Sequence, residues 1–232
     1  ENGLSETLHT LLKQHNLPER WLIHDRDFFV IGETNFDSGL NFLATWHAFR
    51  HYRETNQGGK VTRLHVISFE KSLLSKSDLK QALAAWPDLT LLSEQLIAAY
   101  PYAVPGCQRL RFDDGAVVLD LWLGDVNELL PQLYVPTTGL VDAWCLDEVP
   151  SGKNPDLWTA HFCAQLYRLS RPLTTLATLS ATDFIRRGLT DAGFATNKVT
   201  GYDSEHSMLV GHSQKTESHT DTPSATSIAI VG

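Results

Sequence analysis

The feature that most constrains this chain is a regular alternation of short apolar runs with amphipathic stretches. Buried strands are predicted at the apolar runs, which are residues 28–33, 64–70, 141–147 and 176–180. Helices are predicted where apolar residues recur every three or four positions, which are residues 40–53, 75–85, 89–100, 158–169 and 182–192. This alternation predicts an α/β fold whose mostly parallel sheet is covered by helices on both faces.

Two segments depart from the alternation. Residues 109–123 indicate a hairpin that turns near Asp114 and Gly115, and its second arm is expected to continue as a core strand toward Gly124. Residues 194–199 and 207–210 are two strand candidates with no helix between them. They predict an antiparallel pair at the edge of the sheet.

The last part of the chain has a different composition. Residues 212–227 include eight Ser or Thr and no large apolar side chain, so we expect a linker there. Residues 228–232 (IAIVG) then have the pattern of a buried strand that reaches a glycine. We therefore expect one domain over residues 1–211 and the first strand of another domain at 228–232.

Charge and composition exclude several classes of protein. A formal net charge of −8 is unlike a general nucleic-acid binder, which is basic over most of its surface. Only residues 148–200 are locally basic, with six Lys or Arg against four Asp or Glu. The longest apolar runs are about seven residues, far short of the roughly 20 that span a bilayer, so no membrane partner is expected. The three cysteines lack metal-ligand spacing, which favours a reducing, cytoplasmic compartment.

Four acids follow or end predicted strands: Glu33, Glu70, Asp125 and Asp147. In an open parallel sheet, ligands bind beyond the carboxyl ends of the strands. Glu70 is placed to accept hydrogen bonds from both ribose hydroxyls of a nucleoside cofactor, and Asp125 to accept from an adenine amino group. Any one of these acids is also compatible with a solvated loop start or a helix cap. The recurrence of four in the same position favours a ligand site.

Two other signals are weaker. A nucleotide cofactor normally lies against a glycine-rich turn, but residues 33–39 (ETNFDSG) contain a single glycine, Gly39. His47 and His51 lie four residues apart on a predicted helix, a spacing that suits a metal. No third ligand accompanies them, so we expect polar-face histidines and no metal site.

Several segments resemble, in the same order along the chain, the MnmC-type tRNA-modifying methyltransferases. The resemblance covers roughly residues 1–211, and 153–158 is its most specific part. The matching segments are 31–34 (IGET), 39–43 (GLNFL), 67–71 (ISFEK), 121–125 (LWLGD), 141–147 (VDAWCLD), 153–158 (KNPDLW), 184–189 (FIRRGL) and 191–194 (DAGF).

The resemblance implies a class I S-adenosylmethionine-dependent methyltransferase, with a seven-stranded Rossmann-like sheet, a hairpin insertion and antiparallel edge strands. It implies methylation of 5-aminomethyl-2-thiouridine at the wobble position of tRNA. The carboxyl-terminal domain of the same chain would use FAD to supply that amine. Residues 1–211 would then be the methyltransferase domain and 228–232 the first strand of the FAD-binding domain.

The resemblance also implies roles for single residues. Asp147 would position the substrate amine and ease its deprotonation, although an Asp that caps the following turn is the alternative. The expected cofactor-binding residues are Glu33 and Gly39 at the methionyl side, with Glu70, Gly124 and Asp125 at the ribose and adenine. The expected substrate-binding residues are Lys153, Asn154 and Pro155 over the target base. If the chain binds tRNA, the locally basic stretch 148–200 should carry the phosphate contacts, with Arg186 and Arg187 as the leading candidates. The two arginines are equally compatible with solvated helix positions.

Some positions depart from the family. Asn35 and Asp37 stand where the family has glycines, and an acidic stretch at 201–206 replaces a basic cluster. Asp37 would either bring a carboxylate near the methionyl carboxylate or cap a helix that starts near Ser38. An alternative function is therefore a divergent homologue with weakened or lost catalysis that serves as a tRNA- or domain-docking module. A small-molecule amine methyltransferase would explain the acidic surface but not residues 153–156.

Overall fold

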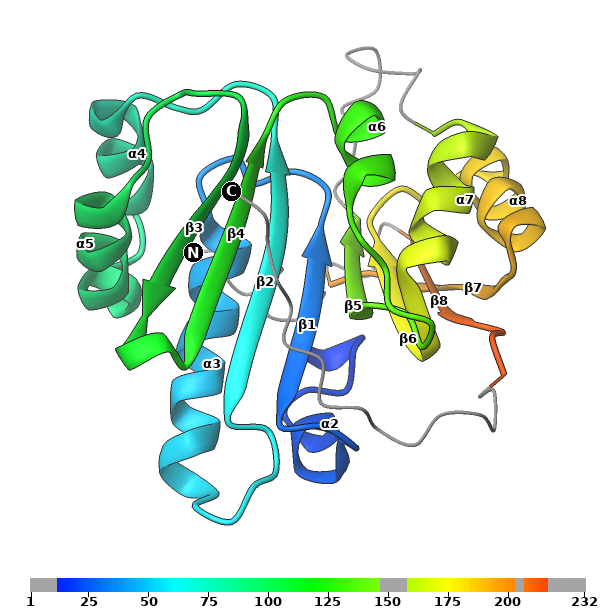
Figure 1. The fold of residues 1–232 in the computed structure, drawn as a ribbon, viewed down its shortest axis with the longest axis horizontal. Helices are drawn as coiled ribbons and strands as arrows, with labels where there is room; N and C mark the ends of the chain where they lie inside the picture. Colours follow the sequence, from blue (N-terminus) through cyan, green and yellow to red (C-terminus); the bar gives the residue numbers. More distant parts are fainter. Residues whose placement is uncertain (1–11, 147–157, 203–206, 217–232) are drawn as a thin grey trace.

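The computed structural model describes residues 12–146, 158–202 and 207–216. Its centre is an eight-stranded sheet with the order β3-β4-β2-β1-β5-β6-β8-β7 (Figure 1). The strands are β1 Phe28–Glu33, β2 Arg63–Glu70, β3 Gly106–Phe112, β4 Val117–Leu123, β5 Val141–Leu146, β6 Ser170–Thr178, β7 Phe194–Thr200 and β8 Ser207–Ser213. From β4 to β6 all neighbours are parallel, while β3, β7 and β8 pair antiparallel with their neighbours.

Helices cover both faces of the sheet (Figure 1). On one face lie α3 Leu40–Thr55, α4 Lys76–Leu83 and α5 Thr90–Ala99, and on the other α6 Val126–Leu129, α7 Ala160–Leu169 and α8 Asp183–Ala192. The short elements are α2 Glu19–Ile23, η2 Pro87–Leu89, η3 Asp113–Gly115 and η4 Leu130–Gln132. Alternate residues of the central strands enter two separate apolar clusters, because successive side chains of a strand point to opposite faces. None of the described helices combines the length and apolar character needed to cross a membrane.

The predicted alternation and both departures from it are confirmed. The hairpin turns at η3, where Asp114 has a φ of 55°, and β4 then pairs parallel with β2 in the core of the sheet. The chain returns after α8 as β7 and β8, which pair antiparallel, with β7 at the edge. The sheet therefore has the seven strands expected of the methyltransferase fold, plus β3 from the hairpin.

Three details differ from the prediction. β6 begins at Ser170, six residues earlier than expected, because its first six residues are mostly polar and show no continuous apolar run. The four- and five-residue helices α6 and α2 were not predicted, since they are too short for helical periodicity. β8 continues to Ser213, beyond the predicted boundary at residue 211, and Lys215 Nζ donates to the Ser170 carbonyl at 2.6 Å.

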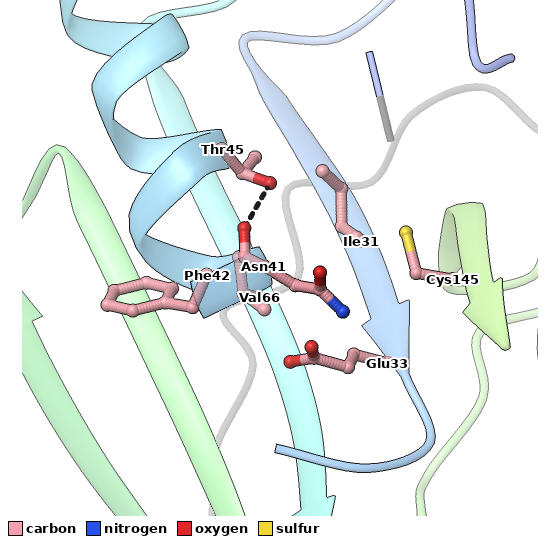
Figure 2. A pocket seen from close by; sticks show the side chains of 7 residues that line it. All are labelled: Ile31, Glu33, Asn41, Phe42, Thr45, Val66 and Cys145. Carbon is pink, nitrogen blue, oxygen red and sulfur yellow. Dashed lines mark hydrogen bonds between the residues drawn. The ribbon is translucent and has the colours of Figure 1, made fainter. Parts of the chain in front are cut away.

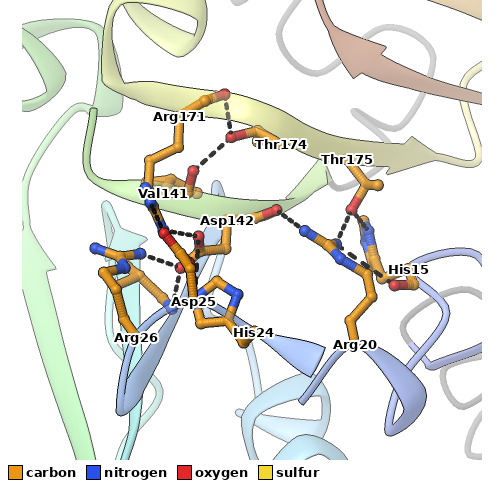
Figure 3. Close-up of polar contacts among 11 residues, drawn as sticks. His15, Arg20, His24, Asp25, Arg26, Val141, Asp142, Arg171, Thr174 and Thr175 are labelled. Atoms are coloured by element: carbon orange, nitrogen blue, oxygen red, sulfur yellow. Dashed lines mark hydrogen bonds and ion pairs between the residues drawn. The ribbon is translucent and has the colours of Figure 1, made fainter. Parts of the chain in front are cut away.

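A network of charged groups ties the segment before β1 to β5 and β6 (Figure 3). Its centre is Asp142, which is buried in β5 and whose carboxylate accepts from the backbone N–H of Val30 at 2.8 Å. Arg26 and Arg171 donate to the same carboxylate at 2.6 and 3.1 Å. Arg20 donates to the Asp142 carbonyl at 3.0 Å. β1 and β5 pair only from Ile31 and Ala143 onward. The N–H of Val30 therefore has no backbone acceptor in β5, and the Asp142 side chain supplies one.

His15 extends this network into the core. Its ring is fully buried, with Nδ1 2.7 Å from Thr175 Oγ1 and Nε2 3.6 Å from Cys145 Sγ. Burial, with a smaller contribution from the positive charge of Arg20, lowers the pKa of His15 from 6.5 to about 3. The folded chain therefore holds a neutral imidazole at this position down to acidic pH.

This buried imidazole predicts an acid sensitivity of folding. Between pH 6.5 and 3 the unfolded chain binds a proton at His15 that the folded chain does not, so lowering the pH favours unfolding. The free energy of unfolding falls by about 1.4 kcal/mol for each pH unit, which is about 2 kcal/mol between pH 6.5 and 5. Urea unfolding at both pH values should show that His15→Gln loses less stability on acidification than the unaltered chain. His47→Gln, at an exposed position on α3, is the control, and an equal acid loss in all three proteins would contradict the prediction.

Candidate functional site

The parallel strands bring three of the four predicted acids to one edge of the sheet. Glu33 ends β1 opposite Ser68 of β2, and Glu70 ends β2 opposite Leu123 of β4. The backbone N–H of Gly124 donates to the Glu70 carbonyl at 2.9 Å, which places Asp125 beside β2. Asp147, the fourth acid, lies outside the described residues, directly after the last residue of β5.

Glu70 has a carboxylate held by two backbone amides. One oxygen accepts from the N–H of Asp37 at 2.9 Å, and the other accepts from the N–H of Ser72 at 2.8 Å. The side chain is buried, and Phe36 N–H donates to the Phe69 carbonyl at 2.8 Å nearby. The loop after β1 is therefore fastened to the end of β2. The carboxylate is fixed in direction and retains lone pairs for the hydroxyls of a ligand.

Glu33 lies deeper than Glu70, in a pocket beneath the start of α3 (Figure 2). It is only 2% exposed, and its carboxylate accepts from the Ser68 hydroxyl at 2.7 Å. The amide of Asn41 is directed toward this carboxylate from the first turn of α3 (Figure 2). Ile31, Phe42, Thr45, Val66 and Cys145 complete the lining.

The two predicted glycines both occupy positions that a larger residue would strain. Gly39 has a φ of 71° just before α3, and a Cβ there would lie 2.6 Å from the ring of Phe36. Gly124 has a φ of 146°, and a Cβ there would lie 3.2 Å from Leu129. The backbone turns between β1 and α3 and between β4 and α6 thus depend on glycine.

Asp125 combines two interactions. It is the N-cap of α6 and accepts from the N–H of Asn127 at 3.0 Å, so the capping alternative applies to this acid. Lys71 Nζ lies 3.0 Å from the other carboxylate oxygen. This hydrogen bond is the main reason that the pKa of Asp125 is lowered. The side chain stays 31% exposed, so it remains open to a ligand at the edge.

Asp37 occupies a conformation that favours glycine. Its φ is 48° and its side chain is exposed. The helix-capping alternative is wrong, because α3 starts at Leu40 and its N-cap residue is Gly39. The backbone at position 37 thus has a conformation that glycine adopts without strain, and the side chain adds an exposed carboxylate to the loop.

The basic residues predicted to contact tRNA lie on α8. Arg187 is exposed there, and Arg186 forms an ion pair with Asp183 at 3.5 Å. Lys198 of β7 also lies 3.6 Å from Asp183. α8 follows β6, so its first turn is at the carboxyl edge, but on the far side of β5 from Glu70. Lys153, Asn154 and Pro155 lie outside the described residues.

Three residues of this edge were not predicted. Ser68 holds Glu33, and its polar side chain in an otherwise apolar strand was an available signal. Ser72 holds Glu70 through its backbone, which no sequence pattern reveals. Asn41 faces the pocket from α3, where its amide looks in sequence like any polar helix residue. Within the described residues, no group of three His, Cys, Asp or Glu side chains is arranged to hold a metal ion.

Comparison with known proteins identifies the family. Residues 87–214 match a family described as S-adenosyl-L-methionine-dependent methyltransferases. The chain is 52% identical over 211 residues to the tRNA 5-methylaminomethyl-2-thiouridine biosynthesis bifunctional protein MnmC of Aeromonas hydrophila, covering 91% of this chain and 31% of that protein. The chain belongs to this methyltransferase family. The MnmC protein of Vibrio cholerae is 48% identical over 210 residues, which are 90% of this chain and 31% of the relative.

A solved structure agrees with the fold of this methyltransferase. The crystal structure of MnmC2 from Aquifex aeolicus superposes with a TM-score of 0.66, at 21% sequence identity, over 89% of this chain and 59% of that one. The chain spans about a third of the length of the curated MnmC relatives, so it corresponds to their methyltransferase part.

The described residues of this methyltransferase fit the family's cofactor, S-adenosylmethionine. Two amides hold the Glu70 carboxylate in place, and its remaining lone pairs suit the two hydroxyls of a ribose. Asp125 follows the glycine turn at the end of the neighbouring strand, where a carboxylate suits an adenine amino group. Both carboxylates lie at the carboxyl ends of the parallel strands, where ligands bind in this class of fold.

Two variants of Asp37 separate backbone strain from charge. Asp37→Gly should stabilise the chain by about 0.5–1 kcal/mol. A non-glycine residue in the left-handed region costs about 1–2 kcal/mol, which glycine avoids, but glycine also raises the conformational entropy of the unfolded chain and so cancels part of the gain in stability. Asp37→Asn keeps a side chain that tolerates the conformation and removes only the charge. If the carboxylate repels the methionyl end of the cofactor, both variants should bind S-adenosylmethionine more tightly in titration calorimetry. Unchanged affinity in both would contradict the repulsion.

Proposed function

We propose that this chain transfers a methyl group from S-adenosylmethionine to the 5-aminomethyl group of wobble 2-thiouridine in tRNA. The observation that carries the proposal is the 52% identity, over 91% of the chain, to a protein named for biosynthesis of the methylated nucleoside. When bound, the cofactor supplies a methyl group on a positively charged sulfur. The protein contributes alignment and exclusion of water, since a neutral amine attacks such a methyl with little covalent help.

We assign the cofactor to the edge formed by β1, β2 and β4. Glu70 accepts from the ribose hydroxyls and Asp125 from the adenine amino group, with Gly124 allowing the backbone turn between them. Glu33 and Gly39 line the methionyl side. The fixed carboxylate of Glu70 and the loop held at Asp37 support this assignment, because hydrogen bonds within the chain itself position both.

We assign the substrate to the segment after β5 and to α8. Asp147 would accept a hydrogen bond from the substrate amine and favour loss of its proton. Lys153, Asn154 and Pro155 would shape the loop over a base that leaves the stack of the anticodon loop. Arg186 and Arg187 would contact phosphates from the exposed surface of α8.

We further propose that the functional protein has a second, FAD-dependent domain in the same polypeptide and acts on tRNA in the cytoplasm. The relatives that carry this proposal are named bifunctional and are about three times the length of this chain. FAD would bind only to that other domain.

The second candidate function, a divergent docking module with weakened catalysis, has one specific observation in its favour. Asp37 adds an exposed carboxylate at a left-handed loop position beside Glu70. Methyl transfer to tRNA that lacks the wobble methyl group separates the two functions. Cofactor-dependent transfer supports the enzyme, whereas tRNA binding without transfer supports the docking module.

The role of Asp147 can be tested by removing its charge while keeping its shape. Asp147→Asn should lower the rate of single-turnover methyl transfer by roughly two orders of magnitude, the scale of acid–base groups. Cofactor affinity in calorimetry should stay nearly constant, because Glu70 and Asp125 hold that ligand. Glu128→Gln, which removes an exposed charge on α6, is the control. A near-normal rate in Asp147→Asn would remove this residue from the mechanism, and an equal loss of cofactor binding would show that it only shapes the pocket.

The phosphate contacts of α8 predict a change in salt dependence. Replacing Arg186 and Arg187 together by Ala should weaken tRNA binding and reduce the slope of log affinity against log salt by about one for each lost contact. Lys76 and Lys80, two exposed cations on α4, provide a control variant with the same loss of charge. Filter binding at several salt concentrations measures both slopes. Equal slopes for the two double variants would contradict the assignment to α8.

A further inference from the structure

Phe184 presents an aromatic ring to solvent beside the basic residues of α8, the outermost helix on its side of the sheet (Figure 1). It is the second residue of that helix and is 61% exposed. Ile185 and Leu189 form the buried side of α8, so Phe184 lies on a face turned away from the core. A single exposed apolar side chain is ordinary on a protein surface, so the meaning of this one depends on what surrounds it.

Three cationic side chains converge on Asp183, the residue directly before Phe184. Arg186 Nε lies 3.5 Å and Lys198 Nζ 3.6 Å from the same carboxylate oxygen of Asp183. Arg187 Nε donates to the Asp183 carbonyl at 3.2 Å, so this side chain is drawn back toward the first turn of the helix. Because Lys198 belongs to β7, two separate elements build this group, which we call the Asp183 cluster.

The Asp183 cluster has an excess of positive charge. Its three cations face one carboxylate, which leaves two positive charges uncompensated in a chain whose net charge is −8. The Asp183 side chain is 68% exposed, and exposed ion pairs are weak, so a second anion can compete for these cations. Cations beside an exposed aromatic ring are the combination that binds single-stranded nucleic acid, since the cations contact phosphates and the ring stacks on a base.

The strand register places this surface near the proposed reaction site. Thr178 ends β6 and pairs with Leu146, the last residue of β5. α8 begins shortly after Thr178, so the Asp183 cluster and Phe184 lie at the carboxyl edge of the sheet. A nucleotide bound there would share this edge with Asp147, which directly follows β5.

We propose that Phe184 stacks on an unpaired base of the tRNA anticodon loop, while the cations of the Asp183 cluster contact adjoining phosphates. This inference rests on the proposed tRNA substrate, and it adds contact with a base to the phosphate contacts already assigned to α8. Stacking needs a free base face, which double-stranded RNA does not offer. Phe184 would therefore select the loop of the tRNA over its stems, without touching the reacting atoms.

Salt dependence separates stacking from charge in the 232-residue chain. Phe184→Ala should weaken binding of tRNA that lacks the wobble methyl group about tenfold at each salt concentration. The slope of log affinity against log salt should stay unchanged, because no phosphate contact is lost. Phe184→Trp should bind as well as the unaltered chain. Phe184→Leu should be as weak as the Ala variant, because leucine is apolar but has no aromatic face.

Tyr134→Ala is the matched control. Tyr134 is also an exposed aromatic residue, but it follows Leu133, whose carbonyl accepts from Arg168 in the last turn of α7, toward the opposite edge of the sheet. This variant should leave tRNA affinity unchanged. Both Phe184→Ala and Tyr134→Ala should keep the midpoint of thermal unfolding within about 2 °C, because both side chains are on the surface.

Asp183→Asn gives a prediction of the opposite sign. It removes the one negative charge of the Asp183 cluster, so tRNA should bind more tightly than to the unaltered chain. If Asp183 served only to hold the cations in place, its loss would weaken binding. Weaker binding by a normally folded Asp183→Asn variant would therefore overturn the phosphate role of the cluster.

A fully double-stranded RNA shows whether the ring contacts a base, since Phe184→Ala and the unaltered chain should bind it equally. Equal tRNA affinity of these two proteins would overturn this inference alone. So would a loss that persists with the duplex or that Phe184→Leu restores. A change of oligomeric state in Phe184→Ala, seen by sedimentation, would also overturn it and assign this face to contact between two copies. Absence of tRNA binding by the unaltered chain would overturn the tRNA substrate and this inference together.

Discussion

One buried carboxylate determines how the two halves of this sheet meet. Asp142 lies where β1 and β5 begin to pair, and the register of β5 against β6 shifts at this same point. An isolated charge in such a position would be strongly unfavourable, so it is matched by Arg26 and Arg171 and by the N–H of Val30. The ladder beyond it spans only three residues of each strand. The alignment of the end of β1, with Glu33, against β5 therefore depends on Asp142.

The loop after β1 makes a tight turn although it contains a single glycine. The left-handed backbone conformation of Asp37 costs about 1–2 kcal/mol of stability. The hydrogen bonds from Phe36 to the Phe69 carbonyl and from Asp37 to Glu70 offset this cost and fix the loop against β2. The substitution of glycine thus affects charge at this edge more than it affects backbone shape. The same amide that restrains the loop also orients the carboxylate expected to hold the ribose.

The sequence was sufficient for features that depend on local pattern. Buried parallel strands are nearly continuous apolar runs, so β1, β2 and β5 could be located, and with them the edge positions of Glu33 and Glu70. The start of β6 could not be located, because most of its first six residues are polar. They are held by contacts such as that of Thr174 with the Val141 carbonyl.

Features that depend on distant pairs were beyond the sequence. Arg26 and Asp142 are 116 residues apart, so Asp142 looked like any residue inside a buried strand. The roles of Asp147 and of residues 153–155 still rest on resemblance to the family, since they lie outside the described residues.

The strand order also constrains how the methyl-donating cofactor and the methyl-accepting tRNA would meet. Glu33, Glu70 and Asp125 belong to β1, β2 and the end of β4, all on one side of β5, whereas α8 follows β6 on the other side. A cofactor held by the first group and a tRNA held by α8 would therefore approach each other across the end of β5. Asp147 is the next residue after that strand, so in the proposed mechanism the acid that orients the amine comes from the one strand between the two ligands. In the proposed arrangement, this separation would let the basic residues of α8 attract phosphates without placing cations beside the positively charged sulfur of the cofactor, where like charges would repel.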